Sequence, residues 1–157
     1  MASNLKVIIE NSQAKFKIPS GTRMLVRRSC HAVLQREHYD AQAEIHVVFA
    51  DNDLLNEYAD RRVSSFEATE LVTLPSDDEG LNLGTIIISV ERILELVKVY
   101  NQPYEMGIVY SAVHGVLNLL GYYYTDVRAR EEQMINEAAI LTALGFPPLA
   151  GAADFAI

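Results

Sequence analysis

The chain has little cysteine and no long apolar run, and each shortage excludes a class of protein. Cys30 is the only cysteine among 157 residues, so neither an internal disulfide nor a cysteine metal cluster can form. Apolar runs such as 86–88 and 116–120, the latter interrupted by Asn118, fall far short of the roughly 20 residues that span a bilayer. The first residues also lack the charged-then-apolar layout of a secretion signal. Together these shortages predict a cytoplasmic protein with no membrane partner.

The charge is negative overall but unevenly distributed. The net charge is −8, yet residues 1–50 carry seven basic and four acidic side chains, whereas 51–157 carry six basic and seventeen acidic. An acidic protein has no general attraction to nucleic acid, although a local basic surface can still bind a phosphate backbone. The candidates for such a surface are Lys15, Lys17, Arg23, Arg27, Arg28 and Arg36. The alternative is an ordinary solvated helix face.

Apolar and β-branched runs bounded by turn residues predict four strands, and helical spacing of apolar residues predicts five helices. The length corresponds to one domain, and half of the residues are hydrophobic, which is enough for a sizeable core. The expected strands are 5–10, 43–50, 70–74 and 83–89, and the expected helices are 22–36, 52–58, 90–100, 103–120 and 126–144. The order predicts a single α+β domain.

The ends of the first helix can also be predicted. Ser20 or Thr22 is the expected cap at its start. The residues at helical spacing that should face the core are Met24, Leu25, Cys30, Val33 and Leu34. After the last helix, residues 147–157 are rich in proline, glycine and alanine, which predicts a loose tail.

The helix expected at 104–120 is apolar nearly all round, which is typical of a buried central helix. One stripe breaks this pattern, because small and polar residues at offsets 0, 4, 7, 8 and 11 share a single helical face. They are Gly107, Ser111, His114, Gly115 and Asn118. One interpretation is close packing over the glycines with a hydrogen-bonded histidine; the other is a functional site.

Four motifs, in order, resemble those of the YbeY family of metal-dependent endoribonucleases. Residues 114–122, HGVLNLLGY, are similar to the family signature H-G-x-L-H-L-x-G-Y-D-H. Residues 83–89, LGTIIIS, resemble the strand L-G-D-I-x-I-S, and residues 68–75, ATELVTLP, resemble P-T-D-V-L-S-F-P. Residues 49–52 resemble the end of the family's second strand. The resemblance implies a YbeY-like domain over 1–146, with a mixed four-stranded sheet packed against about five helices, one central and buried.

The resemblance also implies a metal site, from which this sequence departs. The family's three histidines hold a divalent metal, usually zinc, and leave a position for water. Only His114 is kept, because the second ligand position is Asn118 and the third is Tyr124. An amide oxygen is a poor zinc ligand, and a tyrosine with an ordinary pKa of about 10 would have to ionise. We therefore expect zinc to bind weakly or not at all.

Further family positions fall on residues with partly changed chemistry. Glu70 takes the place of an aspartate and keeps its charge, and Thr73 takes the place of a serine and keeps its hydroxyl. The family's arginine, thought to act on the RNA phosphate, falls on Val63, and only a shifted loop would let Arg61 or Arg62 replace it. Together with Arg23 and Arg27, these two arginines are the predicted RNA contacts.

Three hypotheses follow for function. In the first, the chain is a catalytically impaired relative that still contacts ribosomal RNA or a ribosome-associated protein in rRNA maturation. In the second, it is an active hydrolase whose rebuilt site uses His114, Glu70, Asp126 and Tyr124 to hold magnesium or manganese. In the third, it is a non-catalytic interaction domain that presents the tyrosine run 122–124 to a protein partner.

Overall fold

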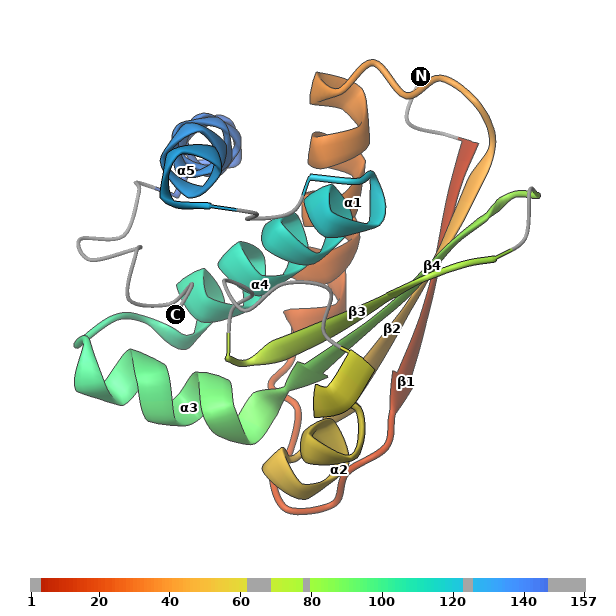
Figure 1. Ribbon diagram of the computed structural model, residues 1–157. Helices are drawn as coiled ribbons and strands as arrows, with labels where there is room; N and C mark the ends of the chain where they lie inside the picture. Colours follow the sequence, from red (N-terminus) through yellow and green to blue (C-terminus); the bar gives the residue numbers. More distant parts are fainter. Residues whose placement is uncertain (1–3, 62–68, 78–79, 123–125, 147–157) are drawn as a thin grey trace.

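The computed structural model describes residues 4–61, 69–77, 80–122 and 126–146 (Figure 1). Its sheet has the strand order β1-β2-β4-β3. The strands are β1 (Leu5–Asn11), β2 (Ala43–Ala50), β3 (Leu71–Pro75) and β4 (Asn82–Ser89). The pairs β1–β2 and β2–β4 are parallel, whereas β3 runs antiparallel to β4. The sheet is therefore mixed and four-stranded, as predicted.

The helices surround one central helix, α4. The helical elements are α1 (Thr22–Arg36), α2 (Asn52–Glu57), a 3-10 turn η2 (Ala59–Arg61), α3 (Val90–Val99), α4 (Tyr104–Leu119) and α5 (Val127–Ala143). Every residue of α4 from 106 to 119 is buried, because α1, α3, α5 and the strands β3 and β4 all pack against it (Figure 1). The helix that is apolar all round is thus the buried central one, as its composition predicts.

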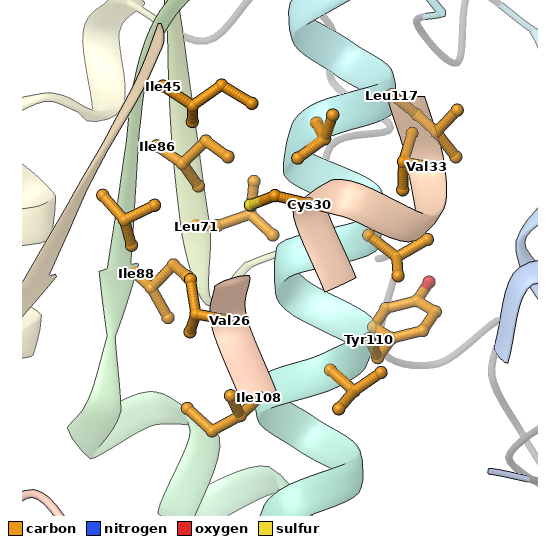
Figure 2. Close-up of a cluster of buried hydrophobic side chains, with 14 of the residues drawn as sticks. Val26, Cys30, Val33, Ile45, Leu71, Ile86, Ile88, Ile108, Tyr110 and Leu117 are labelled. Atoms are coloured by element: carbon orange, nitrogen blue, oxygen red, sulfur yellow. The ribbon is translucent and has the colours of Figure 1, made fainter. Parts of the chain in front are cut away.

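The main core lies between the sheet and the pair α1 and α4. Figure 2 shows Ile45, Ile86 and Ile88 pointing from the strands toward Cys30 of α1 and Ile108 of α4. A smaller cluster lies on the other face of the sheet, where α2 covers it with side chains that include Leu55. Successive side chains of a strand point to opposite faces of the sheet, and here both faces of β4 are covered. This accounts for the unbroken isoleucine run in β4.

Glycine lets α4 lie directly on its neighbours. A Cβ at Gly115 would come within 2.7 Å of Ile86 Cγ2 on β4, and one at Gly107 within 2.8 Å of Ile93 Cγ2 on α3. At contacts this short the neighbouring side chain would have to shift, so close packing favours glycine at both positions. The glycines in the stripe of α4 are therefore explained by close packing.

The ends of the elements agree with prediction to within two residues, but two details of α1 were wrong. The cap is Gly21, with φ of 89° and no side-chain hydrogen bond, rather than Ser20 or Thr22. Met24 is 67% exposed, and Val26 is fully buried. Local spacing could not fix the rotation of α1, because the packing against α4 determines which side of the first turn is covered.

The helices α2 and α5 are capped by aspartate side chains. Asp51 accepts a hydrogen bond from the backbone N–H of Leu54, and Asp126 accepts one from Ala129. Residues 147–157, expected to be a tail, lie outside the described part of the chain. Among the described helices, none is long and apolar enough to cross a bilayer.

Candidate functional site

A group of polar side chains is buried where α4 meets the start of β3 and the middle of α5. We call this group the buried polar cluster: Glu70, Ser111, His114, Asn118 and Glu137. Each side chain belongs to a residue that is at most 2% exposed. Buried polar groups cost free energy unless they are hydrogen-bonded, so five in one place require a specific arrangement.

The histidine is held by a carboxylate from another helix. Nδ1 of His114 lies 2.8 Å from Oε1 of Glu137, and both residues are buried. The carboxylate is the acceptor, so Nδ1 carries the proton and the ring orientation is fixed. A carboxylate on one ring nitrogen is the arrangement that orients metal-binding histidines in proteins, where the other nitrogen binds the metal. The first expected ligand thus has the support that such a ligand needs.

Glu70 enters the cluster from the sheet side. Its backbone carbonyl accepts a hydrogen bond from the N–H of Ser89, which fixes the residue at the start of β3. Its Oε1 accepts from the Ser111 hydroxyl at 3.3 Å, and that hydroxyl lies 2.8 Å from the Gly107 carbonyl oxygen. Oε2 is buried and has no hydrogen-bond partner among the described residues. The carboxyl group is therefore only partly satisfied.

Burial raises the pKa of the Glu70 carboxyl from 4.5 to about 7. The main cause is the loss of solvation, which disfavours the charged form. The neighbouring His114 and the Ser111 hydroxyl lower the pKa and offset part of this effect. Near neutral pH, Glu70 is thus divided between the neutral and the charged form.

An arginine that the motifs did not indicate lies beside this carboxyl. Arg92 of α3 donates from Nε to the Thr69 hydroxyl at 3.4 Å, and its positive charge lowers the pKa of Glu70. Its side chain remains 38% exposed. The site therefore has one cation that reaches both solvent and the first residues of the β3 segment.

The donor set does not fit a zinc hydrolase site within the described residues. Asn118 lies one helical turn after His114 on the same buried face, where the resemblance requires a second imidazole. The Asn118 Nδ2 has no hydrogen-bond partner among the described residues. No three histidine, cysteine, aspartate or glutamate residues in that part of the chain come together as a metal-binding group. The third family position, Tyr124, lies outside the described residues.

The other predicted site residues are spread over the molecule. Thr73 is fully buried on β3, on the same strand face as Leu71 and hence toward α4. Asp126 is exposed, and its carboxylate caps α5 through the 2.7 Å bond to the Ala129 N–H. Thr73 can thus support the cluster from the sheet, while Asp126 already has a structural role.

The predicted RNA-contact arginines that the structure describes lie on α1 and in the turn η2. Arg23 stacks over the ring of Phe49 at 6.0 Å, and Arg61 stacks over that of Tyr58 at 5.5 Å. Arg27 is exposed on α1, and Arg62 lies outside the described residues. Their contact with RNA stays a prediction.

Glu137 was missed by the sequence analysis, although a signal was present. On α5, buried residues recur at offsets 0, 4, 7 and 8: Gln133, Glu137, Ile140 and Leu141. A glutamate at a core position of an amphipathic helix needs a buried partner, but the spacing does not say which residue provides it.

Known proteins are similar to this chain over most of its length. The profile of the family described as Endoribonuclease YbeY matches residues 8–145. An Endoribonuclease YbeY of Alkaliphilus oremlandii is 27% identical over 147 residues, which cover 89% of this chain and 97% of that protein. One of Pelotomaculum thermopropionicum is 32% identical over 139 residues, covering 83% and 90%.

The fold is also found in an experimental structure. The solution structure of TM1509 from Thermotoga maritima matches with a TM-score of 0.57 at 17% identity, over 88% of this chain and 91% of that one. This likeness concerns the fold alone.

Proposed function

The chain belongs to the YbeY family, which is described as Endoribonuclease YbeY, and from this membership we propose that it is an RNA-associated relative whose hydrolytic metal site is impaired. The observation that carries the proposal is the pair His114 and Asn118. The first ligand position keeps its imidazole and its supporting Glu137, while the second offers only an amide. A water-activating zinc needs three strong donors and an open position, and this set falls short of that requirement.

RNA association rests on the family and on the arginines, of which Arg23 and Arg27 lie in the basic segment 1–50. The proposed partners are ribosomal RNA or a ribosome-associated protein, in rRNA maturation and ribosome biogenesis. Exposed Arg27 and the stacked Arg23 and Arg61 are the proposed phosphate contacts. If they act in this way, binding of a single-stranded RNA should weaken as salt increases, and charge reversal at Arg23 and Arg61 should reduce the salt dependence.

The decisive experiment measures metal content and RNA cleavage together. The purified chain is dialysed against zinc and manganese, the metal is measured by elemental analysis, and cleavage of an rRNA fragment is followed. The proposal expects far less than one metal ion per chain, and cleavage no faster than in His114→Ala. Near-stoichiometric metal that disappears in His114→Ala, together with cleavage, would contradict it.

A restored site provides the positive control. The double substitution Asn118→His and Tyr124→His returns the three family imidazoles to the chain. If the scaffold and Glu137 are intact, this variant should bind close to one zinc ion per chain and cleave RNA faster than the unaltered protein. If the restored variant folds yet binds no zinc, the loss extends beyond the ligands, and the protein's role is then non-catalytic.

One observation favours the active alternative. Glu70 brings a buried, half-ionised carboxyl next to His114, and oxygen donors suit magnesium or manganese better than zinc. In that case manganese-dependent cleavage should be lost in Glu70→Ala as well as in His114→Ala. Cleavage that survives Glu70→Ala would exclude this alternative.

A further inference from the structure

A groove separate from the buried polar cluster lies between α1 and α5. Its cavity volume is about 700 Å³, within the roughly 300–1,000 Å³ of small-molecule sites in proteins. It is lined by residues of α1, the loop after it and the C-terminal part of α5, and none of these residues belongs to the cluster. The groove is therefore a separate site from the buried polar cluster.

The groove is positively charged in an acidic protein. Arg27, Arg28 and Arg36 all line it, and no lining residue is acidic, although the whole chain carries a net charge of −8. None of the ion pairs between described residues involves any of these three arginines. Three guanidinium groups without a carboxylate at the same cavity repel one another, so an anion placed there would stabilise the arrangement.

Two of the arginines are held in place across the groove. The Arg36 Nε donates to Oδ1 of Asn136 on α5 at 2.9 Å, and an Arg28 terminal nitrogen lies 3.5 Å from the Leu144 carbonyl oxygen. A guanidinium has five N–H donors, so each of these contacts leaves others for an anion. The shorter Arg36 bond positions its guanidinium before a ligand arrives, which lowers the entropy cost of binding.

Apart from the arginines, the groove is lined by five apolar residues and by the polar residues His31, Gln35 and His38. Met24, Ile140 and Leu144 provide hydrocarbon surface, and Met24 is 67% exposed. Nδ1 of His31, a buried atom at the same cavity, has no hydrogen-bond partner among the described residues. No phenylalanine, tyrosine or tryptophan lines the groove.

From the cationic groups, the apolar walls and the volume, we propose that this groove binds a small amphipathic anion, that is, an apolar body carrying a carboxylate or a phosphate. The arginines bind the anionic group, and the walls at Met24, Ile140 and Leu144 cover the apolar body. The groove residues lie outside the buried polar cluster, and only Arg27 is shared with the proposed RNA contacts.

The test titrates the full chain with matched probes and follows backbone amide shifts by NMR. Octanoate is compared with octylamine, which has the same chain and the opposite charge, and adenosine monophosphate is compared with adenosine. We expect saturable shifts centred on α1 and α5 with octanoate and weaker or no binding of octylamine. Tighter binding of adenosine monophosphate than of octanoate would identify a phosphate as the preferred anion, and the reverse would identify a carboxylate.

Charge reversal supplies the second arm. Arg27→Glu combined with Arg28→Glu should weaken octanoate binding by roughly tenfold, because exposed ion pairs are individually weak. The control is Arg128→Glu, an exposed arginine of α5 that does not line the groove. A third variant, Ala32→Trp, fills the cavity and should abolish binding while both charges remain.

Three results would overturn the proposal. The first is equal binding of octanoate and octylamine, or octanoate binding that is unchanged in all groove variants. The second is failure of every small anion together with arginine-dependent binding of a single-stranded RNA, which would make the groove a nucleic-acid contact. The third is a dimer, detected by sedimentation velocity, that Ala32→Trp dissociates. RNA cleavage, or its lack, does not bear on any of these results.

Discussion

Glu70→Gln should stabilise the protein at alkaline pH and have little effect at acidic pH. Burial holds the pKa of the folded-state carboxyl at about 7, against 4.5 for the ordinary group. The folded state therefore binds its proton more tightly than the unfolded state does. The proton on Glu70 makes its full contribution to the free energy of unfolding below pH 4.5, and this contribution is lost as the pH rises through 7. Glutamine removes the titration while keeping an oxygen that can accept from Ser111.

The magnitude follows from the same two values. A difference of 2.5 pKa units corresponds to about 3 kcal/mol at 1.36 kcal/mol per unit. The free energy of unfolding of Glu70→Gln minus that of the unaltered protein should thus rise by about 3 kcal/mol between pH 4.5 and pH 8. Subtracting the two pH profiles cancels the titration of all other groups that the substitution leaves unchanged.

The assay is urea unfolding followed by circular dichroism at closely spaced pH values, with a chelator present so that no cation pairs with Glu70. Glu131→Gln, on an exposed position of α5, is the control and should change the difference far less. A flat difference profile for Glu70→Gln would refute the reasoning. It would mean that the charged carboxylate is compensated in the folded protein, by His114 or by Arg92, as fully as it is by water.

Two further substitutions test the packing and the pairing. Gly115→Ala should lower the free energy of unfolding by about 1–3 kcal/mol, because its methyl group would meet Ile86 at 2.7 Å. Gly80→Ala, with no atom within 4 Å of the added carbon, should have little effect, and equal losses in urea unfolding would count against the packing argument. Glu137→Ala should cost about 1–3 kcal/mol by leaving the buried His114 donor without its acceptor. Glu137→Gln, which restores an acceptor, should recover part of that loss, and no recovery would show that the carboxylate serves packing alone.

Three residues of the buried polar cluster could be predicted from the sequence. His114, Asn118 and Glu70 were identified from motif order, and the structure brings them into one buried cluster with Ser111. Arg92 was not predicted, because a charged residue near the start of a helix is usually solvated. Glu137 was not predicted either, since its partner lies 23 positions away on another helix. No local pattern states which face of one helix meets which face of the next.

The sequence by itself determined the order of strands and helices, the burial of α4 and the absence of the second family histidine. These features depend on local periodicity and on residue identity, which need no knowledge of distant contacts. Only the tertiary structure decided that Glu137 holds His114, that Glu70 loses its solvent and that three arginines gather in an α1–α5 groove. The reason is physical: hydrogen-bond partners, solvation and the field of neighbouring charges are set by which surfaces pack together, and packing joins segments that are far apart along the chain.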